Sequence, residues 1–190
     1  MSETNFQKIT ICGLAGTGTT SLGKELAGKL GYAFISAGEL FRKKAKEDGI
    51  SLAELEERAK ADERYDRDLD QRMQVFGRTH ICFVVEGRLA WRNIPDSIKI
   101  LLVCEDEIRI QRVARRDMIP FEQAQRETRH REALIQERYA CLYGIVDLTE
   151  RSQFDITIST EDAGVAEIAS ELVALLYDMG LPRPVRTGTF

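Results

Sequence analysis

The stretch KITICGLAGTGTTSLGKELAGKL, residues 8–30, contains the features that decide the fold. Its first residues form a short apolar run typical of a buried strand, and residues 20–30 have the pattern of a helix that ends before Gly31. Between them lies GLAGTGTTS, whose glycines let backbone N–H groups converge on phosphate oxygens. This order of strand, loop and helix predicts a phosphate-binding loop, with a turn that serves only chain geometry as the alternative.

One position of this loop departs from the usual pattern. The pattern G-x-x-x-x-G-K-[ST] would place lysine at position 19, where this chain has Thr19. The hydroxyl of Thr20 remains available to ligate Mg²⁺, and that of Ser21 can support the loop. The residues expected to bind nucleotide phosphates are Gly13, Ala15, Gly16, Thr17, Gly18, Thr19, Thr20 and Ser21. The missing cation would have to come from arginines elsewhere in the chain.

Four further apolar runs predict strands buried on both faces: YAFIS from Tyr32, ICFVVE from Ile81, IKILLVC from Ile98 and FDITIS from Phe154. Charged stretches with helical periodicity separate them. The alternation predicts an α/β fold, in which a parallel sheet carries helices on both faces. Beyond the first helix, we expect helices at residues 37–49, 51–58, 62–76, 120–143 and 160–177.

Composition narrows the class of protein. At 190 residues with 43% hydrophobic content, the chain is expected to form a single domain over residues 1–180, followed by a loose tail at 181–190. A net charge of −4 argues against nucleic-acid or anionic-membrane binding. Because no apolar run has the length of a membrane span and no signal-peptide pattern is present, we expect a cytoplasmic protein.

The cysteines and histidines do not predict a metal site. Three of the cysteines lie inside apolar runs and all are far apart in sequence, so we expect buried, reduced thiols at Cys12, Cys82, Cys104 and Cys141. His80 and His130 lack the paired spacing of metal ligands.

Polar residues follow the second and third predicted strands, where ligands of parallel sheets bind. After the second strand come Ser36, Gly38 and Arg42, and Arg42 could bind a phosphate through two parallel hydrogen bonds. Taken alone, Arg42 is more typical of a solvated helix surface than of a binding site.

The third strand ends in VVEGRLAW. Glu86 could hold a metal-bound water beside the phosphate loop, and Arg88, which follows Gly87, could reach a ligand phosphate. A charged turn is the alternative. The first, second and third predicted strands are each followed by residues suited to ligand binding, and this agreement favours a binding site.

Residues 109–138 contain eight arginines and no lysine. Forked guanidinium groups suit the dispersed charge of a phosphoryl group in transfer. Several of these arginines are expected to pair with nearby glutamates at the surface. The three assigned a function are Arg112, Arg131 and Arg138.

Taken in this order, the elements resemble the cytidylate kinases of the compact archaeal type, over about residues 8–160. The more specific motifs are SAGELFR, EGRLAW and RYACLYGI. The resemblance implies a five-stranded parallel sheet of the P-loop type. It also implies a helical nucleoside-monophosphate-binding insert at about residues 37–78 and a short lid at about 115–138.

The resemblance further implies transfer of the γ-phosphoryl group of ATP to CMP or dCMP, with Mg²⁺ held by Thr20 and Glu86. Arg42 and Arg88 would hold the acceptor phosphate. The segment DRDLDQR aligns with the helix that recognises cytosine. Its candidates for the base are Arg67, Asp70 and Asp66. Arg131 and Arg138 match the lid, which begins near Arg112.

A monomer acting on small molecules is expected. Two other functions stay open at this point. One is a kinase for another small molecule on the same scaffold, and the other is a nucleotide-binding regulator with weak catalysis.

Overall fold

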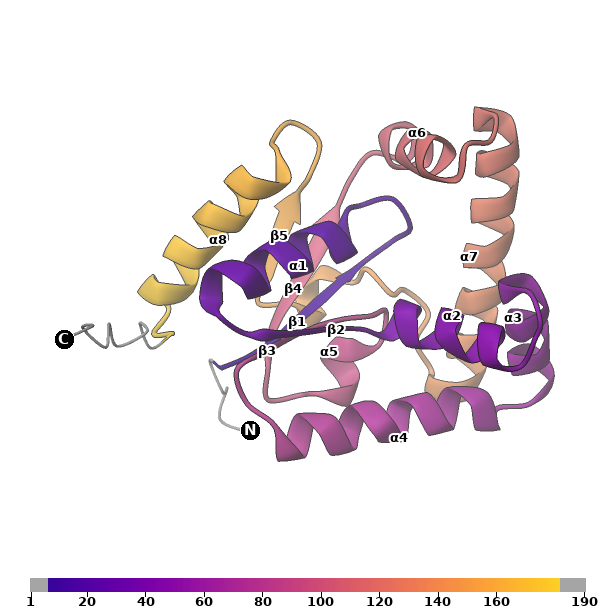
Figure 1. Ribbon diagram of the computed structural model, residues 1–190, viewed down its shortest axis with the longest axis horizontal. Coiled ribbons are helices and arrows are strands. Elements are labelled where there is room, and N and C mark those ends of the chain that lie inside the picture. The colour runs from indigo at the N-terminus through magenta and orange to yellow at the C-terminus, as the bar shows by residue number, and fades with distance from the viewer. Residues whose placement is uncertain (1–6, 182–190) are drawn as a thin grey trace.

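The computed structural model describes residues 7–181, without the side chains of residues 52, 53, 56, 60 and 61. Its centre is a five-stranded parallel sheet in the order β2-β3-β1-β4-β5, shown in Figure 1. The strands are β1 (Lys8–Gly13), β2 (Ala33–Ser36), β3 (Phe83–Glu86), β4 (Ile98–Val103) and β5 (Ile156–Ser159). The predicted α/β fold with a five-stranded parallel sheet is therefore confirmed.

Eight helices accompany the strands within the described part of the chain. They are α1 (Thr19–Leu30), α2 (Ala37–Glu47), α3 (Leu52–Ala61), α4 (Arg64–Thr79), α5 (Ala90–Asn93), α6 (Asp106–Asp117), α7 (Phe121–Tyr143) and α8 (Val165–Asp178), with a 3₁₀ turn at Arg151–Gln153. Ser51, where a helix was predicted to begin, caps α3: its hydroxyl accepts a hydrogen bond from the Glu54 amide (3.1 Å).

The last helix begins later than predicted, at Val165 instead of Thr160. Thr160 continues from the end of β5: its amide donates to the Val103 carbonyl (3.0 Å) and its hydroxyl to the Thr17 carbonyl (2.9 Å). These bonds fix the loop after β5 against the phosphate loop, and the helix begins only after this loop, at Val165.

The two faces of the sheet bury different helices. Ile9 and Ile11 point to one face, where they join the large cluster formed with α1 and α8. Phe83 and Val85 point to the other face and pack against α4 and α5. A layer of helices thus covers each side of the sheet.

The edge strands are less buried than predicted. In β2, Ala33 is exposed, and in β5, Thr157 is exposed, because each strand has a neighbour on one side only. Ile81 is also exposed, and Cys82 has a φ of +58°, so β3 begins only at Phe83.

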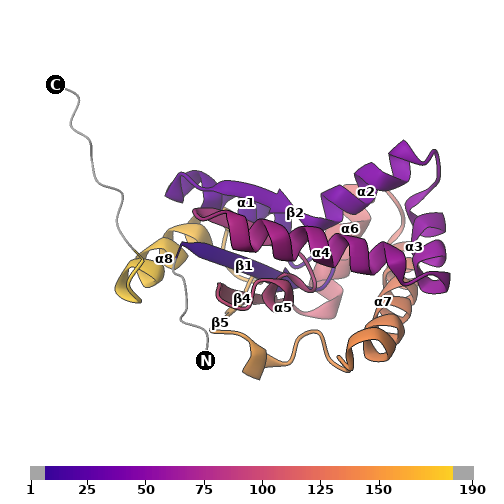
Figure 2. The same cartoon turned by 90° about the horizontal axis from the view of Figure 1, so that it is seen from below.

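The helices that follow β2 and β4 gather at the carboxyl end of the sheet. Figures 1 and 2 agree in placing α2, α3 and α7 together at this end. Two small apolar clusters hold α6 and α7 in place: one is built around Ile110 and Ala124, the other around Ile135 and Tyr139. This end of the molecule therefore carries the less extensively packed helices.

None of the four cysteines forms a disulfide, as predicted. The predicted burial holds for Cys12, where burial raises the pKa of the thiol to about 12, but Cys141 is exposed on α7. Within residues 7–181, no helix is long and apolar enough to cross a membrane, and no group of three His, Cys, Asp or Glu side chains could hold a metal ion. Of the loose tail predicted at 181–190, Leu181 is instead buried in the main apolar cluster, and residues 182–190 lie outside the described residues.

Candidate active site

The loop between β1 and α1 has the backbone of a phosphate-binding loop. Gly16 and Gly18 have φ values of +85° and +91°, which side-chain-bearing residues rarely adopt. Gly18 directly precedes α1, so the amides at the start of this helix open toward the pocket. An anion placed there would meet converging N–H groups and the positive end of the helix dipole.

A pocket of about 810 Å³ extends from this loop to α2, α4, α6 and α7. Residues from all these elements, and from the turn after β3, contribute to its wall. Of the residues predicted from the sequence, those that line it are Gly13, Ala15, Gly16, Gly18, Thr19, Thr20, Ser21, Gly38, Arg42, Asp66, Glu86, Gly87, Arg88, Arg112, Arg131 and Arg138. The structure thus brings most of the predicted residues into one pocket.

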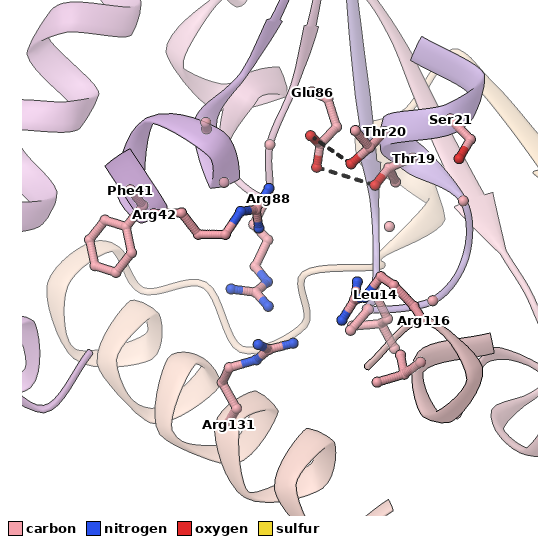
Figure 3. A pocket seen from close by; sticks show the side chains of 18 of the residues that line it. Leu14, Thr19, Thr20, Ser21, Phe41, Arg42, Glu86, Arg88, Arg116 and Arg131 are labelled. Atoms are coloured by element: carbon pink, nitrogen blue, oxygen red, sulfur yellow. Dashed lines mark hydrogen bonds between the residues drawn. The ribbon is translucent and has the colours of Figure 1, made fainter. Parts of the chain in front are cut away.

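Glu86 lies at the end of β3 beside the start of α1. Its carboxylate accepts hydrogen bonds from the hydroxyls of Thr19 and Thr20, each at 3.2 Å, as Figure 3 shows. It also accepts one from Ser36. Ser36 does not line the pocket, because its buried hydroxyl also caps α2 by accepting from the Glu39 amide (3.1 Å).

Three arginines from separate elements point into the same part of the pocket. Figure 3 shows Arg42 on α2, Arg88 after β3 and Arg131 on α7 directed toward one another across the cavity. Like charges at close range repel, so such an arrangement is typical of a site that binds a strongly anionic ligand.

The other two arginines assigned a catalytic role have protein partners. The guanidinium group of Arg112 donates to the carbonyl (2.6 Å) and hydroxyl (3.1 Å) of Thr160. Arg138 is buried and lies 2.9 Å from the Asp66 carboxylate. Both line the pocket, but their charged groups lie toward its opposite ends.

Asp66 on α4 is the buried acidic group of the pocket. Burial raises the pKa of its carboxyl to about 6, since Arg138 lowers it less than desolvation raises it, and Asp70 adds a further raising effect. Leu69, Phe41 and Tyr139 line the same region. This part of the pocket combines apolar and aromatic surface with one carboxylate, which suits a planar polar ring.

Arg67 and Asp70 are not brought to the pocket. Arg67 is exposed and its guanidinium group lies 3.0 Å from Glu63 on the outer side of α4. Asp70 is buried behind the pocket wall, where it accepts from Asn93 (2.7 Å) and Tyr143 (2.6 Å). For Arg67 the cause is helical phase: successive residues of α4 differ in direction by about 100°, which turns Asp66 inward and Arg67 outward. Asp70, one turn after Asp66, faces the same side as Asp66 but is bound by Asn93 and Tyr143.

Thr17 also differs from expectation. It is buried under the loop, and its hydroxyl donates to the Leu14 carbonyl (2.8 Å), so it supports the loop without lining the pocket.

Several lining residues were not assigned to the site from the sequence. They are Leu14, Ala37, Phe41, Leu69, Val113, Arg116, Asp117 and Tyr139. The apolar ones give the same sequence signal as core residues, and only their position beside the strand-end motifs could have pointed to them. Arg116 belongs to the arginine-rich stretch and was assigned to the surface there.

This sheet order, with a phosphate loop between β1 and α1, defines a P-loop kinase fold. Shikimate kinase from Acinetobacter baumannii shares it, with a TM-score of 0.60 at 18% identity over 93% of this chain and 96% of that one. Residues 8–162 match the sequence profile of the cytidylate kinase-like family. The chain belongs to this family.

Individual relatives agree with the family match. A cytidylate kinase from Methanocella arvoryzae is 43% identical over 152 residues, which cover 80% of this chain and 86% of the relative. One from Thermococcus sibiricus is 39% identical over 176 residues, which cover 90% of each. The family match over residues 8–162 spans the loop, both strand-end motifs and the arginine-rich helices.

Proposed function

We propose that the protein transfers the γ-phosphoryl group of ATP to CMP or dCMP, giving ADP and CDP or dCDP. The observation that carries the proposal is the single pocket that joins the phosphate loop to Arg42, Arg88 and Asp66. In a member of the cytidylate kinase-like family, the end of the pocket at the phosphate loop suits the donor nucleotide, and the end at Arg42, Arg88 and Asp66 suits the acceptor nucleotide. We further propose that the protein is a cytoplasmic monomer that acts on small molecules.

The donor end would hold ATP through backbone amides of the loop from Gly16 to Ser21. Thr20 and Glu86 offer only oxygen atoms, the ligands that Mg²⁺ prefers, so the residues present fit this ion. When bound, Mg²⁺ would withdraw charge from the β- and γ-phosphates. The hydroxyl of Thr19 would contribute a hydrogen bond where other P-loops have a lysine.

The acceptor end would lie between α2, α4 and α7, the insert at about residues 37–78 forming one wall. Arg42 and Arg88 would hold the acceptor phosphate before the reaction begins. Asp66 would accept a hydrogen bond from the exocyclic amino group of cytosine, a donor that uracil replaces with a carbonyl oxygen. We expect Asp66, not Arg67, to select the base, because Asp66 lines the pocket.

The reaction needs no covalent enzyme intermediate. An oxygen of the acceptor phosphate would attack the γ-phosphorus in line, while the bond from that phosphorus to the bridging oxygen of ADP breaks. Arg131 would stabilise the charge that grows on the transferring group. Residues 115–138, which include most of α7, would act as a lid that excludes water.

A coupled assay of ADP formation tests the proposal. With ATP and Mg²⁺ held constant, we expect CMP and dCMP to be the best acceptors and UMP, AMP and GMP to have kcat/KM values at least about tenfold lower. Asp66→Asn should reduce the preference for CMP over UMP, since an amide can pair with either ring. Asp68→Asn, a change on the exposed face of α4, is the matched control and should leave the preference intact.

Other outcomes would lead to other functions. Equal turnover of AMP or GMP would contradict the assignment of the acceptor. Transfer to a sugar or shikimate-like alcohol, with none to nucleotides, would indicate a different small-molecule kinase on this fold. ATP binding without transfer to any acceptor would support a regulator.

A further inference from the structure

Arg109 on α6 has a charged side chain that is only 3% exposed. Its guanidinium group makes two hydrogen bonds to the carboxylate of Glu132 on α7, at 2.8 and 3.0 Å. It also donates to Asp106 (2.8 Å). Burial opposes the charge, but the bonds to Glu132 and Asp106 raise the pKa of Arg109, so the group stays protonated. The two-pronged contact joins α6 to α7.

The same two side chains hold one residue of the phosphate loop. The amide of Ala15 donates to Glu132 (3.4 Å), and the carbonyl of Ala15 accepts from Arg109 (3.2 Å). Both backbone polar groups of Ala15 are therefore engaged by helices α6 and α7. The Ala15 amide, which the sequence assigned to phosphate binding, has a protein acceptor instead.

Gly16 allows the phosphate loop to lie in close contact with α6. A Cβ atom at this position would lie 2.1 Å from the carbonyl oxygen of Arg109, a distance that no side chain could tolerate. The phosphate loop thus rests directly on the backbone of α6. Loop, α6 and α7 meet at one point, with the pair of Arg109 and Glu132 at its centre.

We propose that this pair is a positioning device, which fixes α7 against the phosphate loop while phosphoryl transfer takes place. The inference rests on the proposed function. Neither residue lines the main pocket, but Glu132 directly follows Arg131, whose side chain points into it. A bidentate contact fixes both distance and orientation, so it holds Arg131 at a defined place relative to the loop.

The pair of Arg109 and Glu132 should affect both the rate of phosphoryl transfer and the access of water to the site. If it is broken, α7 can separate from the loop, Arg131 loses its position, and water gains access to the γ-phosphoryl group. Binding of the acceptor phosphate by Arg42 and Arg88 does not require the pair. The expected effect is therefore on turnover and on ATP hydrolysis, not on the KM of the acceptor.

Glu132→Gln tests the proposal with the full-length protein. Glutamine keeps the length and one oxygen acceptor but loses the charge and one of the two bonds. We expect kcat to fall roughly tenfold, the KM for CMP to stay within about twofold, and hydrolysis of ATP per transfer event to rise. Glu127→Gln, at an exposed position of the same helix, is the matched control and should change none of these.

Amide hydrogen exchange gives a readout without any reaction. In the ligand-free protein, the Ala15 amide should exchange at least about tenfold faster in Glu132→Gln than in Glu127→Gln, because it loses a charged acceptor. If no nucleotide is phosphorylated, the proposed function fails, but this measurement still decides whether the junction exists. Unchanged exchange would overturn the junction.

Arg109→Lys completes the test. Lysine keeps the positive charge but cannot make the two-pronged contact. If the two residues act as a unit, the double variant Arg109→Lys/Glu132→Gln should lose no more turnover than the worse single variant. Losses in kcat that simply add, or an acceptor KM that rises with unchanged kcat, would overturn the positioning role.

Discussion

At the scale of single residues, Thr19 is the position where this loop departs from the usual lysine. Its hydroxyl donates to Glu86 (3.2 Å) and carries no charge. The sequence assigned the missing charge to three arginines. In the structure all three line the pocket, and Arg112 contacts Thr160 while Arg138 contacts Asp66. Arg131 points into the cavity toward Arg42 and Arg88, and this direction makes it the best candidate to replace the lysine.

This argument predicts a specific rescue. Arg131→Ala should raise the barrier to transfer by about 2–4 kcal/mol, because a charge opposite the transferring group is lost. Thr19→Lys should leave the native protein active, and in the Arg131→Ala background it should recover at least about tenfold in kcat. Steady-state kinetics of the two single variants and the double variant measure this.

Thr19→Met is the control, because methionine is long but uncharged and should recover nothing. No recovery with lysine would show that the two cations are not interchangeable. A native protein without any transfer activity, made active by Thr19→Lys, would instead indicate a nucleotide-binding protein that has lost its chemistry.

At the scale of elements, α4 and α7 meet through the ion pair of Asp66 and Arg138 (2.9 Å). A second contact lies behind it, where Tyr143 of α7 donates to Asp70 of α4 (2.6 Å). Burial and then this hydrogen bond raise the pKa of Tyr143, so its hydroxyl remains a donor. The acceptor wall and the predicted lid are thus joined by buried polar groups.

The pKa of Asp66, about 6, predicts a pH dependence for the acceptor. As pH falls from about 7 to about 5, the carboxyl takes up a proton, becomes an uncharged and weaker acceptor for the cytosine amino group, and leaves Arg138 without its counter-charge. The KM for CMP should therefore rise. The CMP phosphate titrates in the same range, so the useful quantity is the ratio of kcat/KM between the native protein and Asp66→Asn. A ratio independent of pH would contradict the assigned role.

Folding stability should respond to pH in the opposite direction: lower pH weakens acceptor binding but should stabilise the fold through Asp66. The folded protein binds this proton at about pH 6, whereas an ordinary Asp, with a pKa of 3.8, binds it only at lower pH. The contribution of Asp66 to the free energy of unfolding should therefore increase as pH falls from about 6 to about 4. Asp66→Asn should remove this increase.

The sequence was informative about elements to different degrees. The apolar runs and the residues after them predicted the strands and the convergence of Arg42, Glu86 and Arg88, because parallel strands end at one edge of a sheet. The phase of α4 was not predicted: Asp66 and Arg67 are adjacent polar residues, and only packing determines which one faces inward. The inward orientation of Arg109 was not predicted either. Its partner Glu132 lies on another helix and is distant in sequence, so no local pattern connects the two residues.

At the scale of the whole molecule, the main core and the pocket are separate. The largest apolar cluster lies between the sheet and helices α1 and α8, and no residue of α8 lines the pocket. The walls of the pocket are held by smaller clusters and by ion pairs. Stability should therefore depend mainly on residues that have no contact with the substrates.

Two leucines of α8 test this separation. Leu172 is 1% exposed and belongs to the main cluster, whereas Leu175 is 42% exposed. Leu172→Ala should lower the free energy of unfolding by about 2–5 kcal/mol, since it removes buried contacts and leaves a cavity. Leu175→Ala should change it by no more than about 0.5 kcal/mol. Urea titrations measure both, and a single cooperative transition is expected if the chain is one domain. Below the transition, kcat/KM for CMP should stay within about twofold of the native value in both variants; a larger loss in Leu172→Ala would mean that the main core also sets the geometry of the pocket.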